Sequence, residues 1–256
     1  MLIDLSLEIK PTVSEPVPVE IEYVDHVEGA KILGKPAGLT DSDFPDGMGL
    51  SLEYIKLTSH TGTHIDAPIH YGPYSEGKPA KSISELPLDW FFSDGVLLNC
   101  ENKALGTLIT KEELETELVR IGYEIKPLDI VLIKTGADKL WGEKAYFTDF
   151  RGMTREATAW LAEQGVKVIG IDTFGFDAPF HYMLDRYKNT KDQSKLWPSH
   201  FYGREKEYCQ IERLANLDRL KKPFGFKVCC FPIKIQSAGA GWTRVVALIE
   251  EESNES

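Results

Sequence analysis

The alternation of hydrophobic and polar positions predicts a chain that mixes many short strands with a few helices. Alternating or β-branched apolar runs indicate strands, and flanking glycines and prolines mark where each strand ends. Leucines, isoleucines and valines dominate these runs, as in strands that are buried in a sheet. The strands expected on this basis span residues 2–9, 50–58, 95–100, 128–134, 166–171, 226–235 and 242–250.

Two helices are predicted from their capping residues. Thr110, with a glutamate three residues later, fits a capping box, and the helix should run to about Ile121 with Gly122 beyond its end. Thr154 caps a second helix that ends near Gly165. The strand–helix–strand alternation across these segments indicates a parallel part of the sheet with right-handed crossovers.

Other segments lack a clear period. Residues 10–49 mix extended pieces, at 17–24 and 30–33, with Pro, Gly and Asp, which leaves open whether they form a hairpin arm. Residues 71–87 read as irregular chain, and residues 206–220 as short helical turns. The stretch 174–203 is rich in aromatics and lysine, and a loop of this length is usually functional or a lid. We expect one domain over 1–250 and a disordered polar tail over 251–256.

Composition narrows the function classes. The chain of 256 residues has a net charge of -11, which argues against a nucleic-acid backbone as its main partner. Its apolar runs are shorter than the roughly 18 residues that a membrane span needs, and the N-terminus does not resemble a signal peptide. The 4 cysteines are too few and too irregular for a disulfide scaffold. We therefore expect a cytoplasmic protein that interacts with neither nucleic acid nor membrane.

Histidine is concentrated in one stretch. The chain has 6 histidines, and His60, His64 and His70 lie within residues 60–70 together with Asp66. Imidazole and carboxylate ligands suit zinc, manganese or iron(II). The alternative is a coincidence of polar loop residues, each solvated or satisfied locally. The regular spacing favours a metal site.

The spacing also constrains the backbone. A glycine, a proline and β-branched residues oppose a helix here. On a strand the even positions share one face, but a straight strand would separate His60 from Asp66 by roughly 20 Å. Metal–ligand bonds of about 2 Å cannot bridge that separation. We therefore expect an extended segment that bends near Gly62, where glycine accepts unusual backbone angles at little cost.

Several further residues are ambiguous by themselves. His200 lies beside Trp197, where a histidine is ordinarily packed or exposed, and Glu212 lies in a charged run, where it would ordinarily be solvated. Asp172 ends a predicted buried strand, so it either serves a binding pocket or caps a turn. Four aromatic residues fit either a binding pocket or core packing, namely Phe174, Phe176, Phe180 and Trp197.

Residues 60–70 resemble the signature His-x-Gly-Thr-His-x-Asp-x-Pro-x-His of the cyclase family, which includes bacterial kynurenine formamidases and isatin hydrolases. All seven fixed positions match. Gly170-Ile171-Asp172 and the spacing of His200 from Glu212 resemble later segments of the family. The general order of predicted strands agrees over most of the chain.

The resemblance implies a fold and a set of roles. The fold is an α/β (α+β) swivelling β/β/α domain, in which a mixed sheet is packed by helices. His60, His64 and Asp66 are implied as ligands of a first divalent metal. Asp66, His200 and Glu212 are implied as ligands of a second, and His70 as the acid/base. We expect one or two zinc ions per subunit, with manganese as the second choice, and a homodimer or homotetramer.

The leading hypothesis is a metal-dependent hydrolase that cleaves a C–N bond of a small linear or cyclic amide, such as an arylformamide, imide or lactam. A cyclase or dehydratase acting on a small carbonyl substrate needs the same Lewis acid and stays open. An iron(II) oxygenase using His64, Asp66 and His200 would leave the other two histidines unexplained. A non-catalytic zinc protein ranks low, because structural zinc sites often use cysteines. The chain is longer than the compact kynurenine formamidases, so the resemblance specifies the reaction class more closely than the substrate.

Overall fold

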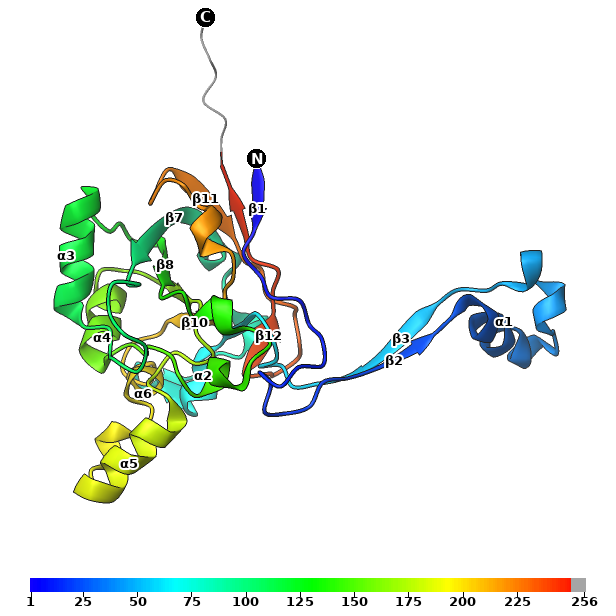
Figure 1. Cartoon of the computed structure of the whole chain (residues 1–256), viewed down its shortest axis with the longest axis horizontal. Coiled ribbons are helices and arrows are strands. Elements are labelled where there is room, and N and C mark those ends of the chain that lie inside the picture. The colour runs from blue at the N-terminus through cyan, green and yellow to red at the C-terminus, as the bar shows by residue number, and fades with distance from the viewer. Residues whose placement is uncertain (250–256) are drawn as a thin grey trace, which may run out of the picture.

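A mixed nine-stranded sheet forms the centre of the computed structural model, which describes residues 1–249 (Figure 1). The strands are β1 (Leu2–Asp4), β4 (His64–Asp66), β7 (Phe92–Asn99), β8 (Ile130–Lys134), β9 (Val168–Ile171), β10 (Cys209–Glu212), β11 (Phe226–Cys229), β12 (Ala240–Trp242) and β13 (Val246–Leu248). Their order is β1-β13-β11-β7-β8-β9-β10-β4-β12. The strands from β7 to β10 pair in parallel and the flanking pairs are antiparallel, which confirms the mixed sheet of an α+β fold.

Two helices connect the parallel strands, as the capping residues predict. Helix α3 (Lys111–Ile121) begins after Thr110, whose hydroxyl accepts a bond from the Glu113 amide, and ends at Gly122 with φ 69°. Helix α4 (Arg155–Glu163) begins after Thr154 in the same way. Both helices cover one face of the sheet (Figure 1).

The parallel strands are buried on both faces, so their side chains enter two separate cores. Along β8, Val131 and Ile133 join the core beneath α3 and α4, whereas Ile130 and Leu132 join the core on the opposite face. This explains why β8 reads as a continuous apolar run rather than an alternating one. The strands thus form a rigid central platform for the loops at their ends.

The sheet is strongly curled. Strands β12 and β13 lie near opposite ends of the strand order, yet only residues 243–245 connect them. A link of this length spans at most about 14 Å, so the two ends of the sheet approach one another. The range 242–250, predicted as a single strand, instead holds the end of β12 and the whole of β13, because the chain crosses from one end of the sheet towards the other between them. Residue 250 lies outside the described residues.

An arm projects from the body of the molecule (Figure 1). It consists of an antiparallel ribbon, β2 (Glu20–Val24) and β3 (Leu52–Lys56), with helix α1 (His26–Gly34) and short 3₁₀ turns at its tip. The sequence left a hairpin arm open, and the structure confirms it. The extended piece predicted at 30–33 is wrong, because Asp25 caps α1 and Gly29 allows that helix to approach the Leu50 backbone closely.

The stretch 174–203 is not a structureless loop. It contains α5 (Phe180–Thr190) and α6 (Pro198–Tyr202). Helix α5 buries only Met183, so the sequence shows no broad apolar stripe that would mark it as a helix. Strand β10 was likewise missed within 206–220, because its four buried residues include a glutamine and a glutamate.

Smaller differences concern ends and turns. The strands predicted at 2–9 and 226–235 end early, at Asp4 and Cys229. The irregular region 71–87 holds a small hairpin, β5 (Tyr74–Ser75) with β6 (Lys78–Pro79), and a single-turn helix, α2 (Pro68–Tyr71), precedes it. The tail predicted at 251–256 lies outside the described residues. Among residues 1–249, no helix has both the length and the apolar character that crossing a bilayer requires.

Candidate metal centre

The histidine motif forms a bent extended segment. Strand β4 carries His64 and Asp66 on one side and Ile65 on the other, where Ile65 enters the core. Gly62 has φ 62°, which confirms the bend that the sequence predicted, and the loop before β4 returns His60 towards the strand. Pro68 then occupies the first turn of α2, where the missing amide hydrogen costs no helical bond.

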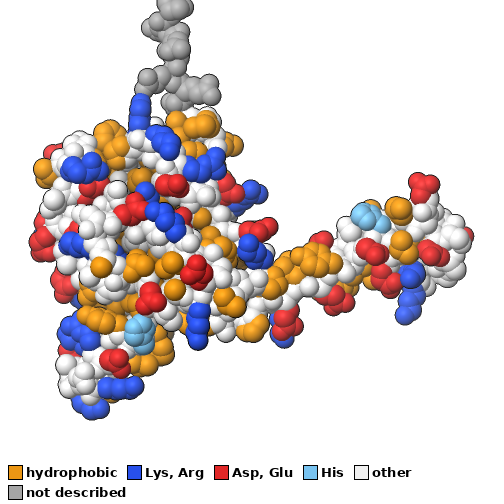
Figure 2. Space-filling view, in the orientation of Figure 1, with side chains coloured by type: hydrophobic (Ala, Val, Ile, Leu, Met, Phe, Trp, Pro, Cys, Tyr) orange, Lys and Arg blue, Asp and Glu red, His pale blue; other side chains and the backbone are white. Residues whose placement is uncertain are grey.

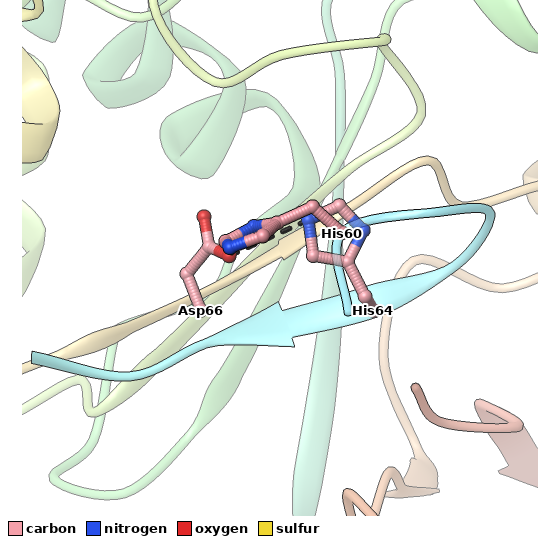
Figure 3. A group of neighbouring side chains, drawn as sticks. All are labelled: His60, His64 and Asp66. Carbon is pink, nitrogen blue, oxygen red and sulfur yellow. Dashed lines mark ion pairs between the residues drawn. The ribbon is translucent and has the colours of Figure 1, made fainter. Parts of the chain in front are cut away.

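Three side chains of the motif converge on one point (Figure 3). His60 Nδ1 lies 2.8 Å from Asp66 Oδ1, and His64 Nε2 lies 3.4 Å from the same oxygen. His64 and Asp66 are fully buried, whereas His60 is partly exposed. The sequence predicted this group, and each of its members offers one ligand atom within 4.8 Å of the others.

Residues distant in sequence complete the cluster. In the antiparallel pair of β10 with β4, Glu212 lies opposite His64, and Glu212 Oε2 is 3.5 Å from His64 Nε2. Helix α6 brings His200 Nε2 to 3.6 Å from both Asp66 Oδ2 and Glu212 Oε1. Asp66 therefore lies between two groups of nitrogen and oxygen atoms. The structure brings together all five residues that the sequence named as metal ligands.

His70 lies on α2 at the border of the same cluster. Its Nε2 is 3.9 Å from Asp66 Oδ2, and its ring centroid is 4.3 Å from that of His60. Asp66, His70 and His200 also lie close enough to hold one ion. Geometry alone therefore allows His70 either to bind a metal or to stay free for proton transfer.

Burial and charge act in opposite directions on these groups. Burial opposes ionisation of Asp66, yet the surrounding histidines outweigh it and hold the pKa of Asp66 well below its usual range. Burial also lowers the pKa of His200, but its contacts with Asp177 and Asp66 raise that pKa to about 10. For His70, burial and the neighbouring histidines together outweigh the opposing charge of Asp66, so its pKa falls to about 4. Asp66 is thus a carboxylate and His70 a neutral imidazole near pH 7.

The residues fit a bound cation. Among the described residues, His64 Nε2 and both carboxylate oxygens of Asp66 are buried and make no hydrogen bond of acceptable geometry, although imidazole nitrogens lie as close as 2.8 Å. Such buried polar atoms are costly unless something satisfies them. His64 Nδ1 lies 2.8 Å from the Gly62 carbonyl, and donating a proton there leaves its Nε2 lone pair directed at the cluster. A divalent metal with mixed nitrogen and oxygen ligands would satisfy all three atoms.

Sequence reasoning missed Asp177. Asp177 is buried, its Oδ2 lies 2.6 Å from His200 Nδ1, and both of its oxygens accept amide bonds from the first turn of α6. This contact directs His200 Nε2 to the cluster, in the way that carboxylates commonly orient metal-binding histidines. No spacing in the sequence reveals the pair, because 23 residues separate Asp177 from His200.

A buried ion pair between Arg213 and Glu15 lies next to the cluster. Arg213 follows Glu212, and its Nη1 donates to both carboxylate oxygens of Glu15 at 2.7 Å. Glu15 also accepts the Gly62 amide at 2.9 Å, which ties the segment before the arm to the bend in the histidine motif. Arg213 lies over the Phe174 ring, 4.0 Å from its centroid. The sequence gave no signal for this pair, since its members are almost two hundred residues apart.

A cavity of about 550 Å³ opens onto the cluster. His60, His70, His200 and Glu212 form its polar end. The rest is mostly aromatic, and includes the predicted residues Phe174, Phe176 and Trp197. Two aromatic residues in the run Tyr146-Phe147-Thr148-Asp149-Phe150 also line the cavity, although the sequence analysis overlooked them. The aromatic lining is Phe147, Phe150, Phe174, Phe176, Phe180 and Trp197.

Asp172 does not line this cavity. It is buried, and its carboxylate accepts bonds from the Thr135 amide and hydroxyl and from the Gly136 amide. Burial raises the pKa of Asp172 to about 7, although these bonds favour its ionised form. The sequence left open whether Asp172 serves a binding pocket or caps a turn. In the structure Asp172 caps the turn that follows β8, at the carboxyl ends of β8 and β9.

Known proteins share this fold and part of this sequence. A kynurenine formamidase of Bordetella petrii is 30% identical over 138 residues, which are 54% of this chain and 59% of that protein. The match thus spans less than two thirds of that relative. An isatin hydrolase bound to the product analogue thioisatinate has a TM-score of 0.75 at 21% identity, covering 98% of this chain and 92% of the other. Isatin hydrolase A from Ralstonia solanacearum has a TM-score of 0.74 at 23% identity, with the same coverage. The family model described as "Putative cyclase" matches residues 3–186, so the chain belongs to the cyclase family.

Proposed function

We propose that this protein is a metal-dependent hydrolase that cleaves the C–N bond of a small linear or cyclic amide. The observation that carries the proposal is the position of Asp66, buried between two groups of metal-ligating side chains at the end of an aromatic cavity. The kynurenine formamidase relative and the isatin hydrolase neighbours support this reaction class. The aromatic lining favours an arylformamide or a ring-fused cyclic amide over an aliphatic one.

In this proposal His60, His64 and Asp66 hold one divalent ion, and Asp66, His200 and Glu212 hold a second. A bound ion of this kind polarises a carbonyl group and lowers the pKa of water from 15.7 to about 7. Asp177 and the Gly62 carbonyl keep the two buried histidines oriented before any cation arrives. The aromatic walls of the cavity hold the amide against the polar end.

His70 transfers the proton. Its Nε2 faces the cluster at the border of the cavity, and its imidazole is neutral near pH 7 because burial lowers its pKa. Nε2 accepts a proton from the attacking water and then delivers it to the departing nitrogen of the amide. Cleavage of a C–N bond requires this second step, because an amide anion is a poor leaving group.

The finer assignments belong to the same proposal. We infer zinc as the bound metal, with manganese as the second choice, because imidazole and carboxylate suit both ions. We also infer a cytoplasmic protein that assembles as a homodimer or homotetramer. Cyclisation or dehydration of a small carbonyl compound is the second candidate, and the family's description supports it.

The test combines metal analysis with a hydrolysis screen of formanilides, isatin, cyclic imides and lactams. We expect stoichiometric zinc or manganese and turnover of at least one aromatic amide. His70→Ala should keep its full metal content and lose most activity, whereas His26→Ala, on the arm, should change neither. Loss of one ion in His70→Ala would instead make His70 a ligand. Metal-loaded protein that is inert towards every amide, or that consumes oxygen with iron(II), would overturn the hydrolase assignment.

A further inference from the structure

Trp197 has an unusual backbone conformation for its residue type. Its φ of 46° and ψ of 51° lie in the left-handed region, where a residue with a Cβ atom is strained. Trp197 also precedes Pro198, and a residue before proline ordinarily takes an extended conformation. Such strain persists only where the surrounding structure enforces it, and it concentrates at functional sites.

Helix α2 shows that the start of α6 does not itself require this conformation. Both helices begin with a proline, at Pro68 and Pro198, and both place a histidine of the candidate site two residues later. Ala67, the residue before α2, is extended, with φ -92° and ψ 158°. The residues before α1, α3 and α4 are extended as well. The left-handed backbone of Trp197 therefore serves something other than starting a helix.

Contacts on both sides of Trp197 enforce its conformation. Its amide donates to the Met183 sulfur at 3.3 Å, and Met183 is the one buried residue of α5. Its carbonyl oxygen accepts a bond from the Phe201 amide at 2.9 Å, within α6. Asp177 accepts the amides of the two residues that follow Pro198. Trp197 is thus fixed between α5 and the start of α6.

The indole of Trp197 lines the aromatic cavity. Its ring centroid lies 5.3 Å from that of Phe180, with 31° between the two ring planes, and both rings line the cavity. Phe180 is 53% exposed, so this pair lies towards solvent rather than in the core. Figure 2 shows hydrophobic side chains in orange, around a histidine in pale blue, where α5 leaves the body. Trp197 and Phe180 therefore form an aromatic surface that a small molecule can reach.

The same residue places this surface next to a candidate metal ligand. Trp197 comes three residues before His200, a separation of about 5 Å along a helix. Because φ and ψ set the direction of a side chain relative to the adjoining chain, the left-handed conformation fixes where the indole lies relative to His200. An aromatic group that stacks on the indole is thereby held close to the polar end of the cavity.

We propose that Trp197 is a specificity-determining residue, and that its strained backbone holds the indole where it stacks on the aromatic group of the substrate. The substrate class is then a small molecule whose flat ring adjoins the bond that is cleaved, as in an anilide or a benzo-fused cyclic amide. Indole favours offset or edge-to-face contact with such rings. This inference rests on the proposed function for the reaction, whereas its test measures binding of a molecule that is not cleaved.

Binding of 5-fluoroindole tests the stacking surface. This probe is a flat, uncharged ring system without an amide bond, and its ¹⁹F signal gives the dissociation constant with and without added zinc. Trp197→Ala and Trp197→Leu should raise that constant roughly two- to twelvefold, whereas Trp197→Phe should keep the natural value. Tyr182→Ala, on α5 but outside the cavity lining, is the control and should bind the probe like the natural chain. An unchanged constant in both Trp197→Ala and Trp197→Leu would refute the stacking role, even if the chain hydrolyses amides.

Stability tests the strained backbone separately. Glycine tolerates the left-handed region, so Trp197→Gly should unfold at a higher urea concentration than Trp197→Ala. At Phe201, inside α6, the order should reverse, because alanine favours a helix more than glycine does. If Trp197→Ala is at least as stable as Trp197→Gly, the position carries no strain and the positioning role is wrong. Protein that binds the probe through Trp197 but is inert towards every amide would contradict the proposed hydrolysis alone.

Discussion

Asp177 Oδ2 lies 2.6 Å from His200 Nδ1, and this contact fixes the direction of the only metal-cluster histidine that does not come from residues 60–70. The same carboxylate accepts amide bonds from residues 199 and 200, so it also holds the start of α6. Position and orientation of His200 therefore depend on one buried side chain. The second half of the candidate metal centre is built around this pair.

Asp177→Asn should weaken metal binding. The amide has no negative charge to favour a proton on His200 Nδ1, and outer-shell changes of this kind cost about 10–100-fold in metal affinity or activity. Competition with a chromophoric chelator measures the affinity of each ion separately. Asp192→Asn, at a half-buried aspartate of the same segment that lies outside the cluster, is the control and should bind metal like the natural chain. Unchanged affinity of both ions in Asp177→Asn would show that Asp177 only shapes α6.

Glu15→Ala should destabilise the protein by about 3–5 kcal/mol, because it leaves the buried Arg213 without its partner. The side chains of Glu15 and Arg213 are 3% and 6% exposed, so water cannot replace the lost contact. Urea unfolding measures the difference. Glu20→Ala breaks the exposed pair with Lys56 and should leave the unfolding midpoint nearly unchanged. A similar small effect of both variants would mean that the Glu15 pair does not hold the histidine motif.

Glu113 should make the protein more stable above its ordinary pKa of 4.5 than below it. Burial alone would raise the pKa of Glu113, but Arg151 and Lys103 outweigh it and lower the pKa. A lowered folded-state pKa means that the unfolded chain binds more protons, so this stabilisation is complete above pH 4.5 and is lost as the pH falls through the folded value.

Glu113→Gln tests that pH dependence. The difference in free energy of unfolding between the natural chain and this variant should be largest at neutral pH and should shrink below pH 4.5. Urea titrations from pH 7 downwards give the difference at each pH. Glu115→Gln, on the exposed side of the same helix, should show almost no such dependence. A constant difference for Glu113→Gln at every pH would rule out the proposed linkage.

Phe147→Ala should weaken binding of aromatic substrates selectively. Phe147 lines the cavity, and its ring centroid is 5.8 Å from that of Phe174. Loss of an aromatic contact of about 0.5–1.5 kcal/mol should raise KM roughly two- to twelvefold. An aliphatic cyclic imide, which cannot form that contact, should keep its KM. Equal changes for both substrates would place Phe147 outside the substrate site.

Local signals in the sequence predicted the elements whose ends are set by neighbouring residues. Thr110 and Gly122 delimit α3 because a hydroxyl cap and a left-handed glycine satisfy the free backbone groups of a helix wherever it lies. The bend at Gly62 followed from the same kind of argument, since ligand spacing and strand rise are fixed by covalent geometry. Helix α5 escaped prediction because Met183 is its one buried residue, so its sequence carries no broad apolar stripe.

The sequence by itself determined the chemistry of the first metal group, because His60, His64 and Asp66 lie on one short segment whose own geometry brings them together. Only the tertiary structure decided how that group is completed. The pairing of β10 with β4 brings Glu212 to His64, and Asp177 directs His200, across separations that no local pattern encodes. Chain folding also decided that Asp172 caps a turn, because strand packing selects which buried polar groups meet. Neighbouring residues determine short-range geometry, whereas long-range contacts depend on how the whole sheet curls.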